Sequence, residues 1–153
     1  MLKKLMQTDE DAGMLIVRLA LGAVIFPHGA QKLLGWFGGH GFEGTLQFFT
    51  GQLGIPVAIA FLVILAESFG AVALIVGFLG RVAAFGVLCV MLGAIFMIHL
   101  PHGFFMNWYG SQKGEGIEYH LLAIGMALAV MIKGSGSLSI DRSMSDKHPN
   151  RYR

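Results

Sequence analysis

Residues 55–79 read IPVAIAFLVILAESFGAVALIVGFL, and Glu67 is their single ionisable side chain. About 20 consecutive apolar residues are enough for a helix to cross the hydrocarbon core of a bilayer. This stretch therefore predicts a transmembrane helix that carries a carboxyl group near its centre. Three further apolar segments occupy residues 14–34, 82–100 and 117–133. Together they predict an all-α fold, a bundle of four transmembrane helices that forms one domain over residues 1–133.

The composition of the chain agrees with a membrane protein. Charged residues make up only 13% of the 153 residues, and 55% are hydrophobic. Soluble domains contain about 25% charged residues, so we expect the lipid bilayer to be the main partner. The net charge of +2 is small, and this argues against nucleic acid as a partner. Cys89 is the only cysteine, so the chain cannot run a dithiol redox cycle on its own.

Lysine and arginine are concentrated on one side of the predicted bundle. Under the positive-inside rule that side is cytoplasmic, so both termini are predicted in the cytoplasm and the loops 35–54 and 101–116 outside. Residues 134–153 form a polar, basic, serine-rich tail, which we expect to be disordered. The basic residues assigned to the cytoplasmic side are Lys3, Lys4, Arg81, Lys133, Arg142, Lys147, Arg151 and Arg153.

The two outward loops follow the same Pro-His-Gly unit, which occurs at residues 27–29 and 101–103. Each unit is followed by a tryptophan with an aromatic neighbour and then by a Glu-Gly pair. The repetition indicates a doubled unit whose polar residues gather at one membrane surface. Trp36 has two interpretations, as a residue of the interfacial aromatic belt or as a contact to a ligand.

Glu67 is the first candidate for chemistry, because ionisable side chains inside membrane spans are costly and are usually functional. In the functional interpretation, Glu67 relays protons or holds a ligand, together with His28. In the structural interpretation, it forms a buried bond to Arg18, to His28 or to a backbone carbonyl. Arg18 itself either extends to the cytoplasmic head groups or forms a structural ion pair with Glu67.

Further polar residues are predicted at the outer end of the bundle, above Glu67. His28, Gln31 and Lys32 share one helical face, because their spacing is i, i+3 and i+4. The alternative for Lys32 is contact with the outer head groups. The candidate ligand-binding residues are Gln31, Lys32, Trp36, His99, His102, Glu118 and His120.

Three interpretations suit this outer cluster. Histidines and carboxylates bind metals such as zinc, copper or iron, but the sequence has no HExxH or similar spacing, which makes a metal the weaker interpretation. The same groups can exchange protons with a quinol or position another small ligand. They can also simply satisfy one another's hydrogen-bonding capacity. The sequence therefore assigns no cofactor, with a quinone favoured over a metal.

Several segments of the chain resemble the DoxX family of bacterial membrane proteins. The residues that carry the resemblance are RLALG at 18–22, HGAQKLLGWFGG at 28–39, ESFG at 67–70, Gly80 with Arg81, His99, GFF at 103–105, and Glu118 with Tyr119. The resemblance covers residues 14–141. It implies four transmembrane helices in a bacterial inner membrane. The family is named for its similarity to a subunit of an archaeal thiosulfate:quinone oxidoreductase, and other members are linked with oxidative-stress and thiol-redox assemblies.

Three functions are compatible with these observations. The first is a redox-linked protein, such as an oxidoreductase subunit, that binds a quinone or another small ligand in the outer polar cluster. The second is a non-catalytic membrane anchor or scaffold for a redox or stress-response complex. The third is transport of a small solute, which the small bundle and short fourth span disfavour. A protein of a redox complex and a second copy of the chain are the candidate protein partners.

Overall fold

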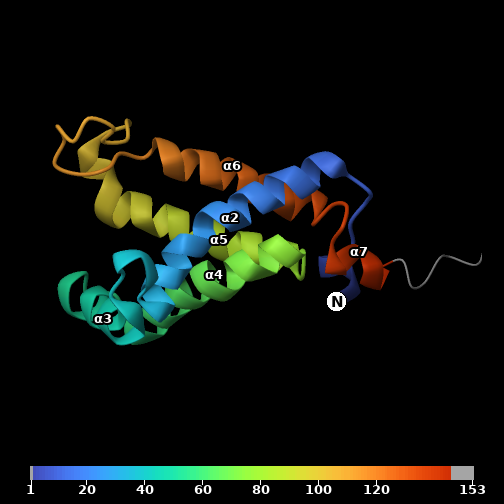
Figure 1. The fold of residues 1–153 in the computed structure, drawn as a ribbon, viewed down its shortest axis with the longest axis horizontal. Helices are drawn as coiled ribbons and strands as arrows, with labels where there is room; N and C mark the ends of the chain where they lie inside the picture. The colour runs from blue at the N-terminus through green and yellow to red at the C-terminus, as the bar shows by residue number, and fades with distance from the viewer. Residues whose placement is uncertain (1, 146–153) are drawn as a thin grey trace, which may run out of the picture.

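The computed structural model describes residues 2–145, and all secondary structure in that range is helical, which confirms the predicted all-α fold. Four helices form the body of the molecule, and shorter helices flank them (Figure 1). The four are α2 (Ala12–Leu34), α4 (Val57–Val76), α5 (Gly80–Ala94) and α6 (Glu118–Lys133). The shorter elements are α1 (Leu2–Met6), η1 (Trp36–Gly38), α3 (Gly41–Gln47), η2 (Phe48–Gln52) and α7 (Ile140–Ser145).

The helix that begins with α5 does not end at Ala94. A π-helical turn, η3 (Ile95–His99), and a 3₁₀ turn, η4 (Leu100–His102), continue it. The resulting rod runs two residues beyond the predicted segment 82–100 and includes Pro101, a residue type that usually breaks a helix. Pro101 is tolerated here because it stands in the first turn of a tighter helix, where its missing N–H is not needed.

The four long helices form a closed ring in which α2 contacts α4 and α6, and α5 contacts the same two helices. Side chains of small or branched residues fill its centre. The most deeply buried of them are Leu21, Ile25, Ala71, Leu74, Ala84, Val87, Ala127 and Val130. Many other large apolar side chains point outward. Helices α2, α4 and 80–102 are long and apolar enough to cross a membrane, so this apolar outer surface contacts the lipid bilayer.

The two ends of the ring differ. The N-terminus and α7 lie together at one end, and α3 and the loop 103–117 lie at the other (Figure 1). The two Pro-His-Gly units are found at the second end, as the sequence predicted for them. The turn between α4 and α5 lies at the first end, where the carboxylate of Asp141 accepts hydrogen bonds from the backbone N–H groups of Leu79, at 2.7 Å, and Gly80, at 2.9 Å. Asp141 of α7 thereby caps the start of α5.

Arg18 lies at the same end and is only 1% exposed. Its guanidinium donates to the carbonyl of Leu74 at 2.8 Å and to that of Ile75 at 2.5 Å. These carbonyls belong to the last turn of α4, beyond which the helix offers few donors of its own. The Leu74 carbonyl also accepts a hydrogen bond from the N–H of Gly77 at 3.2 Å. The remaining bonds reach the segment after α6, at the carbonyls of Ser135 (2.7 Å), Ser137 (3.2 Å) and Leu138 (2.7 Å).

Two expectations are corrected by this arrangement. Arg18 neither extends to the head groups nor pairs with Glu67, because five backbone carbonyls use its donors. The expectation of disorder is wrong for residues 134–145, which fold back under the ring and are held there by Arg18 and by the Asp141 cap. The rest of the predicted tail, residues 146–153, lies outside the described residues.

Replacing Arg18 by methionine should destabilise the protein strongly. The change removes a donor from five buried or half-buried carbonyls, so we expect the free energy of unfolding to fall by about 3 kcal/mol or more. Lys133→Met removes an exposed cation from the same end and should change it by less than about 1 kcal/mol. Denaturation of the two purified variants in mixed micelles measures the difference. Equal stabilities would show that the Arg18 bonds do not hold this end together.

Candidate functional site

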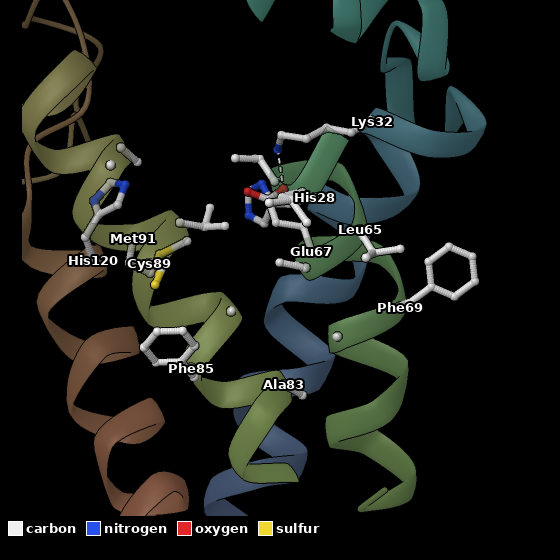
Figure 2. A pocket seen from close by; sticks show the side chains of 18 of the residues that line it. His28, Lys32, Leu65, Glu67, Phe69, Ala83, Phe85, Cys89, Met91 and His120 are labelled. Atoms are coloured by element: carbon white, nitrogen blue, oxygen red, sulfur yellow. Dashed lines mark ion pairs between the residues drawn. The ribbon is translucent and has the colours of Figure 1, made fainter. Parts of the chain in front are cut away.

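A large cavity lies between α4 and the rod 80–102, with a volume of about 1160 Å³. Most of its wall is apolar and comes from these two helices (Figure 2). Several wall residues, among them Leu62, Phe69 and Phe85, are exposed on the outer surface of the ring. Polar side chains gather in the part of the wall that lies toward the loop 103–117. They are His28, Lys32, Glu67, His99, Glu115, Tyr119 and His120.

The polar part of the cavity contains an ion pair between Lys32 of α2 and Glu67 of α4 (Figure 2). The side chain of Glu67 is 6% exposed and that of Lys32 is 22% exposed. A buried carboxylate is costly unless an opposite charge compensates it, and Lys32 provides that charge. The sequence left the partner of Glu67 open, and the structure shows that it is Lys32. The side chain of Lys32 therefore turns into the bundle instead of toward the head groups.

The close packing of α2 against α4 allows the side chains of Lys32 and Glu67 to reach each other. Gly29 of α2 lies directly against the backbone of Glu67, and a Cβ atom at this position would collide with the Glu67 carbonyl. The hydroxyl of Ser68 donates to the Gly29 carbonyl at 3.1 Å and closes the same contact. Small residues allow helix backbones to approach closely in membranes. The glycine of the first Pro-His-Gly unit therefore has a packing role that brings Lys32 within reach of Glu67.

Four aromatic and imidazole rings follow one another along the polar wall. The ring of His28 lies 6.1 Å from that of Tyr119, and the ring of Tyr119 lies 5.3 Å from that of His120. His120 and His99 are closer still, with their ring centroids 4.2 Å apart. Nδ1 of His99 is 2.8 Å from the carbonyl oxygen of Glu115. The row of rings thus leads from the neighbourhood of Glu67 to the loop 103–117.

The structure brings together five of the predicted site residues in this cavity: His28, Lys32, Glu67, His99 and His120. The remaining predicted residues lie elsewhere and have other contacts. Glu118 accepts hydrogen bonds from the backbone N–H of Met106 at 2.8 Å and from Nε1 of Trp108 at 3.1 Å, and so orders the loop.

Three further predicted ligand contacts are also outside the cavity wall. Gln31 donates to the carbonyl of Phe37 at 3.2 Å and thereby holds η1 against the end of α2. Trp36 is exposed on η1, which suits the aromatic-belt interpretation. His102 packs against Gly114 of the loop. Arg18 belongs to the opposite end of the ring, as described above.

Sequence reasoning did not select three wall residues that carry a carboxylate, a thiol or a hydroxyl group, namely Glu115, Cys89 and Tyr119. Tyr119 and Cys89 carry little sequence signal, since an aromatic residue and a lone cysteine in apolar segments are usually packing residues. Cys89 is nevertheless exposed and faces the cavity opposite Glu67 (Figure 2). Glu115 belongs to the second Glu-Gly pair, so the repeated loop pattern was the clue to its position.

The chemistry available in the cavity is hydrogen bonding and proton exchange within apolar surroundings. Within residues 2–145, no group of three or more His, Cys, Asp and Glu side chains is placed to hold a metal ion. The two adjacent histidines, His99 and His120, supply at most two ligands, and a zinc site in a protein needs at least three. The polar wall suits an uncharged organic ligand better.

Breaking the Lys32–Glu67 ion pair should cost more than removing both of its charges. Glu67→Gln leaves a largely buried ammonium unpaired, and we expect a loss of about 3 kcal/mol in the free energy of unfolding. Adding Lys32→Met to that variant should restore more than half of the loss. The same cycle on the pair of Arg142 and Glu10 serves as the control, with a coupling below about 1 kcal/mol, because the Glu10 side chain is 75% exposed. A double variant no more stable than Glu67→Gln alone would contradict this account.

Comparison with known proteins places the chain in a family. The model of the DoxX family matches residues 13–100. "Inner membrane protein YqjF" of Escherichia coli K12 is 30% identical over 147 residues, which cover 93% of this chain and 99% of that protein. "Putative oxidoreductase CatD" of Bacillus subtilis strain 168 is 29% identical over 136 residues, 89% of this chain and 90% of that protein. No solved structure matches the chain. The chain therefore belongs to the DoxX family and is a multi-pass protein of the bacterial inner membrane.

Proposed function

We propose that this protein is redox-linked and binds a quinone, or another redox-active molecule with a polar ring and an apolar tail, in the cavity between α4 and the rod 80–102. The observation that carries the proposal is the division of the cavity wall. One part is apolar and belongs to the outer, lipid-facing surface, and the other contains the Lys32–Glu67 ion pair and the row of rings. A ligand with an apolar tail and a polar ring matches both parts of the wall.

The exposed wall residues support a path from the bilayer into the cavity. Leu62, Phe69 and Phe85 belong both to the cavity wall and to the apolar outer surface. A ligand dissolved in the membrane therefore reaches the polar wall without crossing water. The volume of about 1160 Å³ accommodates a substituted ring together with part of a tail, since sites for drug-sized molecules have about 300–1000 Å³.

The relatives give the redox part of the proposal modest support. CatD carries the word oxidoreductase in its name, and the two chains align over most of their lengths. In this chain, we infer that Glu67 and His28 exchange protons with a bound ring, because both residues line the cavity. Glu67 acts from an ion pair, so proton exchange there is coupled to the contact with Lys32.

The proposal includes a topology with four membrane spans and both termini in the cytoplasm. Helix α6 has 16 residues and a length of about 24 Å, a few ångströms less than the hydrocarbon core. It packs along α5 and α2, and a short helix of this kind is accommodated by local thinning of the bilayer. The polar end of the cavity then faces the periplasmic side, and the Arg18 end faces the cytoplasm.

Single cysteines test this topology in a Cys89→Ser background. Tyr109→Cys lies in the loop 103–117 and Met144→Cys in α7, and both native side chains are exposed. In intact spheroplasts, a membrane-impermeant maleimide should label position 109, because that loop is periplasmic. Position 144 should be labelled only after permeabilisation. Labelling of both positions in intact spheroplasts would overturn the four-span topology.

Filling the cavity should abolish ligand binding without disturbing the fold. Gly93 lines the cavity, and a Cβ atom added there meets no atom within 4 Å, so Gly93→Leu places a side chain in the ligand's volume. Gly125→Leu is the matched control, since Gly125 has the same open surroundings but is not part of the cavity wall. We expect the affinity for a decyl-tailed benzoquinone to fall at least tenfold in the first variant and to be unchanged in the second.

Binding is measured through Cys89, which is exposed in the cavity. A bound quinone should slow alkylation of its thiol by N-ethylmaleimide, and each variant is compared with its own rate without ligand. The benzoquinone must be fully substituted, so that it does not add to the thiol itself. If the quinone protects Cys89 equally in wild type and Gly93→Leu, the ligand does not occupy this cavity.

A membrane anchor for a redox complex is the second candidate function. The observation that favours it is the loop 103–117, in which Trp108 and Tyr109 are exposed, the latter to 95%. Large exposed aromatic residues are enriched where proteins meet partners, although they are also typical of the membrane interface. An anchor does not use the cavity, so under this alternative Gly93→Leu would leave the complex intact.

A further inference from the structure

We propose that Tyr119 and His120 form the second half of the head-group site: the Tyr119 hydroxyl donates a hydrogen bond to a carbonyl oxygen of the bound ring, and His120 provides a further polar contact. This inference rests on the proposed function and specifies its ligand as an uncharged ring with carbonyl oxygens. It concerns binding only and involves no electron transfer.

The first observation is the hydroxyl of Tyr119. Its oxygen is buried and has no hydrogen-bond partner within the described residues. Buried polar atoms in native proteins nearly always have a partner, because leaving one unpaired is costly. Tyr119 lines the cavity, and we infer that a molecule bound there supplies the missing partner. A phenol is a good hydrogen-bond donor, and this suits an acceptor such as a carbonyl oxygen.

The second observation is the neighbouring imidazole. His120 is only 5% exposed and lines the same cavity. The Gly116 backbone lies near the ring, but Nδ1 is buried without a hydrogen bond of normal geometry to any described residue. The packing of His120 on His99, whose Nδ1 is itself engaged by the Glu115 carbonyl, fixes the position of the ring. Tyr119 and His120 are thus adjacent residues of one cavity wall, and each has a buried polar atom.

The charges around the cavity restrict the kind of head group. Lys32 is the one lysine or arginine among the described residues of the wall, and the carboxylate of Glu67 neutralises it. The carboxylate of Glu115 is engaged by the backbone N–H of Asn107 at 2.6 Å. An anionic head, such as a phosphate or a fatty-acid carboxylate, therefore finds no free lysine or arginine in this wall and is disfavoured in the apolar surroundings. An uncharged ring with acceptor oxygens meets no such penalty.

Tyr119→Phe is the decisive variant, because it removes only the hydroxyl. Tyr109→Phe is the matched control, since Tyr109 lies in the loop outside the cavity wall. The dissociation constant of the decyl-tailed, fully substituted benzoquinone is measured by protection of Cys89 from alkylation. We expect it to rise roughly fivefold to tenfold in Tyr119→Phe, the range for loss of one hydrogen bond, and to stay unchanged in Tyr109→Phe. Dodecyl phosphate should protect Cys89 at least tenfold more weakly than the quinone.

Thermal unfolding without ligand distinguishes a binding role from a structural role. A hydroxyl that is unpaired in the empty protein stabilises nothing, so Tyr119→Phe should unfold at the same temperature as wild type or at a higher one. A lower unfolding temperature together with weaker binding would overturn the inference, because the hydroxyl would then hold the fold. Equal affinities of Tyr119→Phe and Tyr109→Phe would overturn it as well. Failure of the wild type to bind the quinone would instead refute the proposed function.

An infrared measurement on the wild type keeps the inference testable if Tyr119→Phe does not fold. The carbonyl band of the bound quinone should lie at lower frequency than that of the same quinone in lipid, because a donated hydrogen bond weakens the C=O bond. Labelling one carbonyl with carbon-13 assigns the band to a single oxygen. An unshifted band for both carbonyls of the bound quinone would contradict the proposed hydrogen bond.

Discussion

The ion pair between Lys32 and Glu67 is the constraint on which the arrangement of the polar end depends. Two opposite charges inside a membrane protein are stable only when they lie together, since each alone carries a large desolvation cost. Their contact requires α2 and α4 to pack closely, which Gly29 permits and the Ser68 hydrogen bond reinforces. The result is a charged but electrically balanced group at the edge of an apolar cavity.

The polar groups at the two ends of the ring differ in their hydrogen bonding. At the end that holds the N-terminus, Arg18 and Asp141 satisfy the backbone groups left free where α4 ends and α5 begins. At the opposite end, the buried hydroxyl of Tyr119 has no hydrogen-bond partner among the described residues. Nε of Arg81 is also buried without a partner, but it lies at the first end and outside the cavity wall. Our proposal places the ligand at the second end because the unpartnered hydroxyl belongs to a residue of the cavity wall there.

The all-α fold was predictable from the sequence because apolar segments of sufficient length have few alternatives to membrane helices. The sequence identified Glu67 and His28 because ionisable side chains in such segments stand out. The sequence did not predict which groups these side chains bond. The position of Arg18 in its helix indicates how deep the residue lies in the bundle, but not that residues 135–138 fold back to meet it. Glu118 was taken for a ligand contact, yet its carboxylate orders a loop that no periodicity describes. Tyr119 was missed because the sequence does not show whether its hydroxyl has a hydrogen-bond partner.

We propose that a membrane-dissolved ring with an apolar tail occupies the cavity between α4 and the rod 80–102. This occupancy can be measured by photo-crosslinking in native membranes with an azidoquinone that carries a decyl tail. We expect the label on peptides from α4, the rod 80–102 and the start of α6, and we expect excess unlabelled quinone to prevent the reaction. Labelling spread over the outer lipid-facing surface, or confined to the loops and insensitive to competing quinone, would contradict the proposal.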